Sequence, residues 1–497
     1  MKIYVRTLKE TARARNIFIP LFQGTSPSEE ELFSFLPKHI EESVQELAHE
    51  EFRGEEGETK SVWFPQSEIK HVRLFGLGEI SKWNWRRENV MPRQLVRYAK
   101  SERIFEFGTR LFSPTSEAIQ DAARCFATNA LLANFDFNRY KQPPKEGWPD
   151  LKTIYLGVGE KDILSAEKGI KEGIILGEET NSCRDLVNTP GSEITPAKLA
   201  HAAVAAAKRT GMTVKILGRR EMEKLGMGGV LGVARGSDEK PKFIILEYRH
   251  GPKNQQPLVL VGKGVTFDTG GLNIKPDMHM YEMHMDMSGG AAVIFGMAAI
   301  ARLNLTVNVI GLVPAVENMP SGSSYRPGDL LKALNGKTIE VLNTDAEGRV
   351  ILADALAYGQ RYKPGLMVDF ATLTGAAHVA LGHYTSALFT KDEMLQQKLY
   401  EVGQRAGDYV WPLPLWDEYL VDIKGTFGDF TNIGKHDRYG GAIHGAKFLE
   451  QFAGDTRWAH IDIAPRMTTV ESDSLAKGAS GVGVRFIVEL ARAYPFA

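Results

Sequence analysis

The sequence predicts an α/β protein with a smaller N-terminal α/β domain and a larger C-terminal domain built on a mainly parallel, helix-covered sheet. The length of 497 residues allows two or three domains. Short apolar runs alternate with segments of helical spacing, as expected of strands buried on both faces of a sheet. Polar, proline-containing stretches at residues 140–150 and 187–196 interrupt this alternation. We therefore predict a first domain over residues 1–165, a connecting helix over 166–185 and a second domain over 186–497.

Two strands and one helix are predicted in the first domain. Residues 72–78 (VRLFGLG) and 152–159 (KTIYLGVG) are short apolar runs typical of buried strands, and residues 115–135 have the apolar spacing of a helix. Residues 82–110 carry eight Lys and Arg against three Glu and include Trp83 and Trp85. Such a stretch could contact nucleic acid, but it is more typical of a solvated helix face.

The second domain shows a stronger alternation of strands and helices. Six apolar runs have the composition of strands buried on both faces, namely residues 213–218, 242–248, 257–262, 306–316, 338–343 and 366–375. Helical patterns separate several of them, which predicts an open, mainly parallel sheet. Ligands bind such sheets at the carboxyl ends of the strands.

The composition is that of a soluble globular protein without a strong charge bias. Hydrophobic residues make up 43% and charged residues 24%, and the net charge of −1 gives no general attraction to nucleic acid or an anionic membrane. The two cysteines, Cys125 and Cys183, are far apart in the sequence, which indicates a reducing compartment. The first 22 residues lack the features of a secretory signal, and the longest apolar run, residues 289–300, is shorter than the ~20 residues that span a bilayer. We expect a cytoplasmic protein.

Several charged side chains follow predicted strands of the second domain. Lys263 and Asp268 come after the run at 257–262, and Asp345 and Glu347 come after the run at 338–343. Asp286 precedes an apolar segment rich in small residues that has the pattern of a helix. We therefore expect these side chains to meet at the edge of the sheet where ligands bind.

Asp345 and Glu347 belong to the octet NTDAEGRV, which places Asp345, Glu347 and Arg349 at every second position. In an extended chain, side chains two residues apart point the same way. The simpler alternative is a solvated turn at a helix start, where acidic residues are favoured by the helix dipole.

Carboxylates that converge in a buried place raise one another's pKa, and divalent cations remove that penalty. Carboxylates shared by two ions about 3.5–4 Å apart form a two-metal hydrolytic centre. The absence of clustered Cys and His argues against a structural zinc site. Lys263 could serve as a nitrogen ligand if a metal removed its proton, although most lysines point into water.

Eight stretches between about residue 180 and residue 467 resemble the leucyl (cytosol) aminopeptidase family in order and spacing. They read VNTPGSEITP, GMGGVLGVARGS, GKGVTFDTGG, NIKPDMHMYEMHMDMSGGAAV, ENMPSGSSYRPGD, NTDAEGRVILADAL, ATLTGAAHVALG and WAHIDIAP. In the first domain, FDFNRYK (residues 135–141) is similar to the family's link toward its catalytic domain. The resemblance implies that residues 186–497 form the catalytic domain of a two-metal exopeptidase, which removes residues from free amino termini.

The resemblance also implies roles for individual residues. One metal would be held by Lys263, Asp268, Asp286 and Glu347, and the other by Asp268, Asp345 and Glu347. A water between the metals would be the nucleophile, because coordination lowers its pKa. Lys275 would stabilise the oxyanion, and Arg349 would hold a bicarbonate ion that acts as a proton shuttle. By the same resemblance, the pocket for the first side chain of the substrate would be formed or shaped by Met283, Asn343, Thr372, Gly375, Ala464 and Met467, together with Lys275.

Methionines and small residues in that pocket would suit leucine and similar side chains, although Pro465 stands where the family usually has glycine. The resemblance further implies a homohexamer, peptide substrates with a free N-terminus, and metals chosen from Mn²⁺, Zn²⁺, Mg²⁺ and Co²⁺. Two alternatives are a hydrolase for Cys-Gly or other dipeptides on the same scaffold, and DNA binding through residues 82–110, as some bacterial members of the family show.

Overall fold

The computed structural model describes residues 1–24, 33, 35–112, 114, 118–435 and 439–496. The chain divides into two compact units, which are Met1–Glu178 with Val470–Ala476, and Glu179–Thr469 with Lys477–Ala497. Helix α5 (Ile163–Asn188) contains the residue at which the first unit ends, and the predicted connecting helix lies inside it.

The segment Val470–Ala476 lies within the predicted second domain but packs with the first unit. Arg93 donates a hydrogen bond to the carbonyl oxygen of Asp473 at 3.2 Å, and Leu475 packs against the apolar core of that unit. The short segment carries no apolar run that would have indicated this placement from the sequence.

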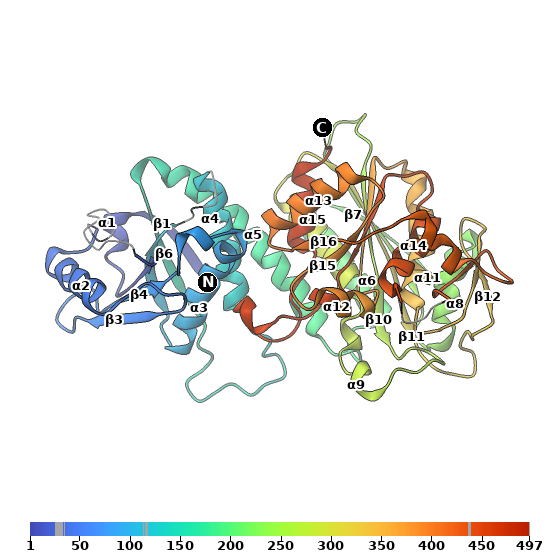
Figure 1. Ribbon diagram of the computed structural model, residues 1–497, viewed down its shortest axis with the longest axis horizontal. Coiled ribbons are helices and arrows are strands. Elements are labelled where there is room, and N and C mark those ends of the chain that lie inside the picture. The colour runs from blue at the N-terminus through green and yellow to red at the C-terminus, as the bar shows by residue number, and fades with distance from the viewer. Residues whose placement is uncertain (25–32, 34, 113, 115–117, 436–438, 497) are drawn as a thin grey trace. The chain divides into compact units, whose positions relative to one another are not determined.

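The first unit is a six-stranded sheet covered by helices on both faces (Figure 1). Its strand order is β1 (Lys2–Thr7), β6 (Thr153–Val158), β5 (Glu106–Arg110), β2 (Asn16–Leu21), β4 (His71–Gly76) and β3 (Thr59–Trp63). All neighbours are parallel except β3, which runs antiparallel to β4 at one edge. The strands predicted at residues 72–78 and 152–159 are confirmed as β4 and β6.

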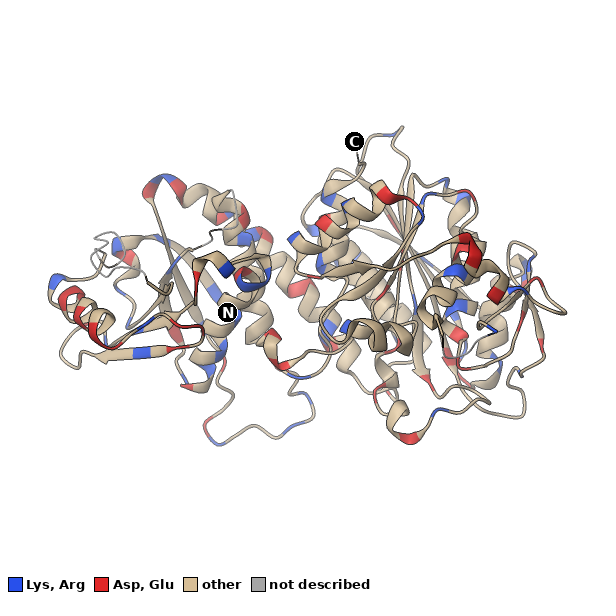
Figure 2. Ribbon diagram, in the orientation of Figure 1, with Lys and Arg blue, Asp and Glu red and all other residues tan. Residues whose placement is uncertain are grey.

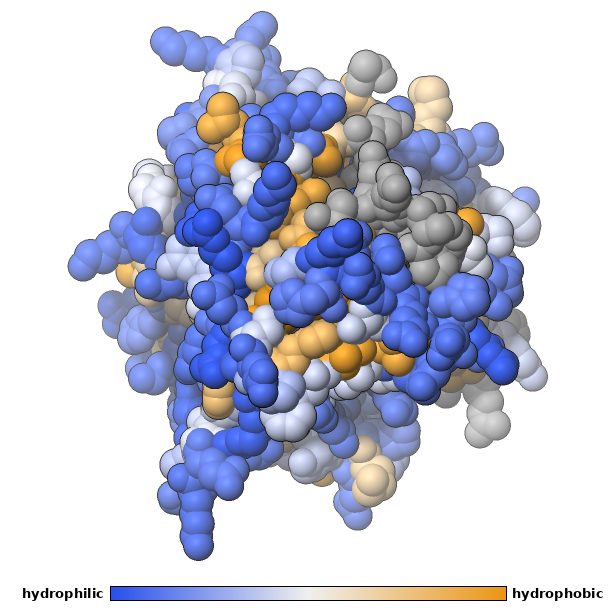
Figure 3. All heavy atoms as spheres, turned by 90° about the vertical axis from the view of Figure 1, so that its left-hand side faces the viewer, coloured by the Kyte–Doolittle hydropathy of each residue, from blue (hydrophilic) through white to orange (hydrophobic). Residues whose placement is uncertain are grey.

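Two apolar clusters form the core of this unit. One contains side chains of α3 (Trp85–Ser101), α4 (Ile119–Asn134) and the start of α5, and the other contains side chains of α2 (Lys38–Glu50). The short helix α1 (Leu8–Thr11) follows β1. The predicted helix at residues 115–135 is confirmed as α4, except that residues 115–117 lie outside the described part of the chain. The face drawn in Figure 3 is mostly hydrophilic, with apolar side chains gathered across its middle.

Most of the positive charge of residues 82–110 is neutralised within the first unit. Five of its basic side chains form ion pairs with carboxylates, namely Lys82 with Glu79, Arg87 with Glu56, Arg97 with Asp136, Lys100 with Asp136 and Asp150, and Arg103 with Glu146. Arg93 is buried, with 4% of its surface exposed. Figure 2 shows acidic residues interspersed with basic ones throughout this unit. This arrangement does not favour a row of phosphate contacts, which requires unpaired cations at the surface.

The second unit is built on a nine-stranded sheet. The strand order is β16 (Val410–Pro412), β15 (Ser386–Phe389), β18 (Trp458–Asp462), β14 (Leu366–Ala371), β9 (Leu258–Gly262), β11 (Asn308–Asn318), β8 (Lys242–Arg249) and β7 (Thr213–Leu217), with β10 (Gly264–Asp268) pairing with β11. The centre of the sheet is parallel, because β18, β14, β9, β11 and β10 all run the same way. Antiparallel pairs occur at β15–β18, β8–β11 and β7–β8.

One predicted strand belongs elsewhere. Residues 338–343 were predicted as a strand of the main sheet, but they do not enter it. Only Thr338–Glu340 are extended, and they form strand β13. This strand pairs with β12 (Leu330–Lys332) and β17 (Phe430–Thr431) in a separate three-stranded sheet. An apolar run of this length does not specify its partner strands, so the sequence could not assign it to a sheet.

Helices cover both faces of the main sheet (Figure 1). On one side α10 (Ser288–Arg302) packs against the sheet, α6 (Pro196–Thr210) and α15 (Val484–Ala493), and α15 packs against α13 (Glu393–Ala406). On the other side α11 (Glu347–Gly359) packs between α8 (Gly228–Val233) and α14 (Gly441–Ala453). The remaining helices are short, namely α7 (Arg219–Leu225), α9 (Asp277–Met280) and α12 (Gly375–Leu381). Asp277–Arg302 is apolar enough to cross a membrane by composition, but 89% of its most apolar window is buried inside the protein.

Candidate functional site

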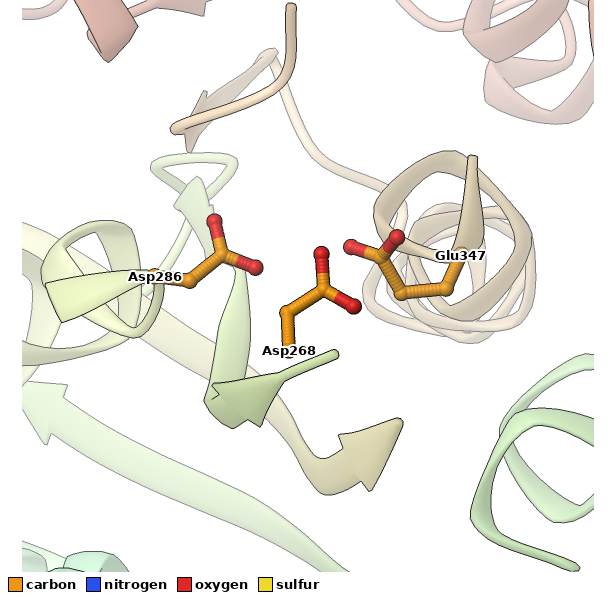
Figure 4. Close-up of side chains that lie close together, drawn as sticks. All are labelled: Asp268, Asp286 and Glu347. Carbon is orange, nitrogen blue, oxygen red and sulfur yellow. The ribbon is translucent and has the colours of Figure 1, made fainter. Parts of the chain in front are cut away.

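Three buried carboxylates from three different elements of the second unit converge at one place (Figure 4). Asp268 is the last residue of β10, Asp286 directly follows the 3₁₀ turn η4 (Met283–Met285) before α10, and Glu347 is the first residue of α11. One oxygen from each carboxylate lies within 4.8 Å of the others, and each residue is at most 4% exposed. Asp268 lies at the carboxyl end of its strand, the edge at which sheets of this kind bind ligands.

Two lysines lie among the carboxylates. Lys263 Nζ is 2.8 Å from Asp286 Oδ1, 2.8 Å from Glu347 Oε1 and 2.8 Å from the carbonyl oxygen of Thr372. Lys275 Nζ lies 2.9 Å from Asp268 Oδ2 and also contacts Asp345 Oδ1. The two ammonium groups therefore contact all four carboxylates that the sequence analysis singled out.

The charges of this cluster do not balance. Four carboxylates face two ammonium groups, so two negative charges stay uncompensated when every group is ionised. Burial, together with the charge of Glu347, raises the pKa of Asp268 well above its usual value, and burial raises the pKa of Asp286 to about 6. Burial also acts to raise the pKa of Glu347, but Lys263 and Lys275 together outweigh it and the pKa is lowered. The pKa of Lys263 is raised, because its carboxylate neighbours outweigh burial, so Lys263 is an ammonium ion in this arrangement.

Asp345 lies in a turn rather than in an extended segment. The chain turns at residues 344–345 and α11 begins at Glu347, so the alternating spacing in NTDAEGRV does not arise from an extended strand. The alternative of a helix start is correct for Glu347, but that side chain is buried and not solvated. The amide of Asp345 donates to Asn343 Oδ1 at 2.8 Å, which closes the turn, and burial raises the pKa of the Asp345 carboxyl.

The donor set fits divalent cations. Asp286 Oδ2 is buried and has no hydrogen-bond partner among the described residues, although a buried carboxylate oxygen normally has one. Cations would supply this partner and would also remove the excess of negative charge. Carboxylate oxygens are ligands for hard and borderline divalent ions. The residues that could hold them are Lys263, Asp268, Asp286, Asp345 and Glu347.

Two glycines allow the site to form. Gly270 has φ +86°, a conformation that side chains rarely adopt, and its amide donates to Asp268 Oδ1 at 2.8 Å. Gly348 lies against Lys263, because a Cβ at this position would be 2.5 Å from Lys263 Cε. A Cβ at Gly270 would lie 2.4 Å from the carbonyl oxygen of Asn273, so a larger residue would distort this loop, and a larger residue at position 348 would displace Lys263.

Arg349 lies in the first turn of α11 and is 7% exposed. Its Nη1 donates to the carbonyl oxygen of Asn432 at 2.8 Å, whereas its Nε is buried without a hydrogen-bond partner among the described residues. Burial lowers the pKa of Arg349 to about 10, although Glu347 and Asp462 act in the opposite direction. In the described part of the chain no carboxylate forms an ion pair with it, so a small anion would find a cationic partner here.

Comparison with known proteins agrees with this geometry. The model of the cytosol aminopeptidase family, catalytic domain, matches residues 181–488, and the model of the family's N-terminal domain matches residues 18–144. This chain belongs to the cytosol aminopeptidase family. It is 40% identical over 479 residues to a probable cytosol aminopeptidase of Syntrophotalea carbinolica, covering 94% of each chain. It is 46% identical over 384 residues to a probable cytosol aminopeptidase of Chlorobaculum tepidum, covering 76% of each chain.

Among solved structures, the bottromycin maturation enzyme BotP in complex with Mn superposes on this cytosol aminopeptidase family member with a TM-score of 0.83. The two chains are 30% identical, and the match covers 97% of this chain and 99% of the other. The family membership makes this protein a metal-dependent hydrolase that acts at the amino ends of peptides.

The residues expected to line or shape the substrate pocket of this aminopeptidase occupy three places. Thr372 donates to Asp286 Oδ1 at 2.6 Å, and Asn343 closes the turn at Asp345. Met283 begins η4, which contacts β10. Ala464 and Met467 lie in and just after the 3₁₀ turn η7 (Ala464–Arg466), which packs against α12, the helix that begins at Gly375. Thr372, Asn343 and Lys275 contact the acidic residues through their side chains, and the carbonyl oxygen of Met283 accepts from the amide of Asp286 at 3.4 Å.

Two buried asparagines near the clustered carboxylates were missed by the sequence analysis. Asn318, the last residue of β11, donates to Asp268 Oδ1 at 2.8 Å and to the carbonyl oxygen of Thr344 at 2.9 Å. Its position at the carboxyl end of a central strand is a signal that could have identified it. Asn432 contacts the turn before α11, and nothing in its local sequence indicates this, because the contact joins segments about 90 residues apart.

Proposed function

We propose that the protein is a leucyl aminopeptidase that hydrolyses the first residue from peptides, with a preference for leucine and similar apolar side chains. The observation that carries this proposal is the convergence of the buried Asp268, Asp286 and Glu347 with an excess of negative charge. A cluster with this imbalance is suited to binding cations and unsuited to stabilising an empty core.

The residues would divide between two divalent cations. Lys263, Asp268, Asp286 and Glu347 would hold one, and Asp268, Asp345 and Glu347 would hold the other. When bound, the cations supply Lewis-acid polarisation of the peptide carbonyl and a water of lowered pKa. Lys263 would have to lose its proton to act as a nitrogen ligand, because its nitrogen now contacts two carboxylates as an ammonium group.

Lys275 and Arg349 would act on the reacting groups. Lys275 contacts Asp268 and Asp345 here, and once cations neutralise these carboxylates its ammonium group can donate to the oxyanion that forms on the scissile carbonyl. Arg349 would hold bicarbonate, which supplies a base for the proton of the attacking water and an acid for the leaving amine. The buried, unpaired Nε of Arg349 supports an anion at this position.

The preference for leucine is proposed from side-chain chemistry. Met283 and Met467 are flexible and apolar, and Ala464 and Gly375 are small. A hydrolase specific for Cys-Gly or other dipeptides remains the alternative on the same scaffold.

The manganese in the BotP structure supports Mn²⁺ as one candidate metal, beside Zn²⁺, Mg²⁺ and Co²⁺. A homohexamer and a cytoplasmic location complete the proposal. The ion pairs in residues 82–110 give no support to DNA as a further partner.

The test is hydrolysis of leucine p-nitroanilide by chelator-stripped protein, before and after addition of Mn²⁺ or Zn²⁺, with Cys-Gly assayed in parallel. Activity on the leucyl amide that returns with metal supports the proposal. Activity confined to Cys-Gly would identify a dipeptidase, and folded protein that hydrolyses neither substrate with any metal would refute the proposed function.

A further inference from the structure

Asn432 is completely buried in the turn that follows β17, and every side-chain hydrogen bond it makes goes to the backbone before α11. Its Oδ1 accepts from the amides of Leu342 at 2.8 Å and Asn343 at 3.3 Å. Its Nδ2 donates to the carbonyl oxygens of Asn343 at 2.6 Å and Ala346 at 3.5 Å. The side-chain amide thus uses both lone pairs and both protons, which is its full capacity.

The backbone of Asn432 extends this contact in both directions along the chain. Its amide donates to the carbonyl oxygen of Glu340 at 3.1 Å, and its carbonyl oxygen accepts from Arg349 Nη1 at 2.8 Å. One residue therefore holds a segment of ten residues from β13 into the first turn of α11. Asp345 and Glu347 lie within this segment, and Asn432 holds the backbone on both sides of Asp345.

The segment needs such an anchor because it lacks regular structure. Between the end of β13 at Glu340 and the start of α11 at Glu347, no strand or helix fixes the backbone. The turn is also held through Thr344, whose carbonyl oxygen accepts from Asn318 at 2.9 Å and whose amide donates to Asn273 Oδ1 at 2.9 Å. Without Asn432, Thr344 would provide the remaining backbone hydrogen bonds from residues 342–346 to other segments. Small displacements of reacting or metal-binding groups reduce rates strongly.

We propose that Asn432 is a positioning residue of the metal centre. It fixes Asp345 and Glu347 in one frame with Arg349, so that the cation ligands and the anion-binding guanidinium keep their spacing. This inference rests on the roles proposed above for these three residues. The competing explanation is that Asn432 only joins the β17 turn to the rest of the unit and stabilises the fold.

A matched control separates the two explanations. Asn308 is also a buried asparagine, 5% exposed, whose side chain makes three hydrogen bonds to backbone atoms of Gly251, Pro252 and Gln255. It begins β11, whose other end at Asn318 contacts Asp268, so it lies about 30 Å from the site at 3.3 Å per residue of strand. Both Asn432→Ala and Asn308→Ala remove a buried amide that is bonded to the backbone.

The experiment compares N432A, N308A and the wild type, each stripped with a chelator. Titration calorimetry with Mn²⁺ alone measures metal binding without substrate, and kcat and KM are then measured on metal-loaded protein. We expect N432A to lose about 10- to 100-fold in metal affinity or kcat, the range for residues that orient metal ligands, with KM changed less than threefold. N308A should stay within twofold of the wild type in metal affinity, kcat and KM, although its melting temperature falls.

A metal affinity and kcat within twofold of the wild type in folded N432A would overturn the proposal and leave Asn432 a purely structural residue. If N432A does not fold, N432D replaces it and N308D becomes the control. N432D keeps the oxygen that accepts from Leu342 and Asn343 but loses the donated bonds, so a loss of metal affinity that N308D lacks is expected, and equal affinities would overturn the proposal. Failure of the proposed function would appear in the wild type itself, whereas failure of this inference appears only as equality of wild type and variant.

Discussion

Each unit holds a cluster of charged side chains around a buried lysine, and the two clusters differ in charge balance. In the first unit Lys100, 4% exposed, contacts Asp136 at 2.6 Å, Asp150 at 3.2 Å and the carbonyl oxygen of Asn134 at 2.7 Å, and Arg97 also contacts Asp136. Two cations face two carboxylates. Burial acts to raise the pKa of Asp136, but Lys100 and Arg97 outweigh it and the pKa is lowered.

In the second unit the pKa values of Asp268 and Asp286 are raised instead, by burial and by the charge of the neighbouring Glu347, and four carboxylates share two lysines there. A cluster in which cations and carboxylates are equal in number needs no ligand to neutralise it. A cluster with excess negative charge and an unpartnered carboxylate oxygen is suited to binding a ligand, and carboxylates favour a cation as that ligand.

The largest expected effect of this difference in charge balance is on catalysis. Glu347→Gln in the second cluster should lower kcat/KM for leucine p-nitroanilide by about 10³-fold, because metal-assisted stabilisation is worth several kcal/mol. Asp136→Asn in the first cluster should leave kcat/KM within about twofold, since it removes only a structural ion pair. Near-normal activity of folded, metal-loaded E347Q would contradict the assignment of the centre.

Metal removal should affect stability through the second cluster alone. At a free Mn²⁺ concentration of 100 times Kd, the protein should gain about 2.7 kcal/mol in free energy of unfolding over the stripped protein. Chemical denaturation with and without Mn²⁺ measures this gain. E347Q should lose most of the gain, whereas D136N should keep it, and an equal gain in both variants would place the cation elsewhere.

Without metal, the two clusters should respond oppositely to neutralisation of one carboxylate. D136N should destabilise the protein by roughly 1–3 kcal/mol, because the buried Lys100 loses a charged partner. D286N should cost less in stripped protein, since removal of one of four crowded carboxylates offsets the lost bond to Lys263. Denaturation midpoints of the stripped variants give the comparison, and a larger loss for D286N would mean that the second cluster is balanced after all.

The smallest expected effect is on the pH dependence of stripped protein. The pKa of Asp286 is about 6 in the folded protein against 3.8 in the unfolded chain, so the folded state binds more protons between these values. The contribution of Asp286 to the free energy of unfolding therefore falls as the pH rises from about 4 to about 6, by an amount on the order of 1–3 kcal/mol.

The contribution of Asp136 has the opposite sign, because its lowered pKa gives stability that is present above pH 3.8 and is lost as the pH falls through the folded-state pKa. Denaturation of D286N and wild type at pH 4 and pH 6.5 measures the first contribution, and denaturation of D136N and wild type at pH 6.5 and at a pH below 3.8 measures the second. Identical pH profiles of D286N and wild type would contradict the raised pKa.

Much of the fold was accessible from patterns along the chain. Strands β4, β6, β7, β8, β9, β11 and β14 overlap the predicted apolar runs, because strands buried on both faces need continuous apolar sequence. The run at residues 338–343 was placed in the wrong sheet, because strand pairing depends on contacts distant in sequence. The segment Val470–Ala476 was grouped with the wrong unit for the same reason.

The sequence by itself determined the family, the α/β class and the chemical types gathered at the site, because these depend on local pattern and residue identity. Only the tertiary structure decided that Asp345 lies in a turn, that Lys263 and Lys275 lie between the carboxylates, and that Asn318 and Asn432 hold the surrounding backbone. Most of these facts depend on contacts between residues from 23 to about 90 positions apart in the chain. Charge balance in a buried cluster is a property of three-dimensional proximity, so no reading of the chain in one dimension can supply it.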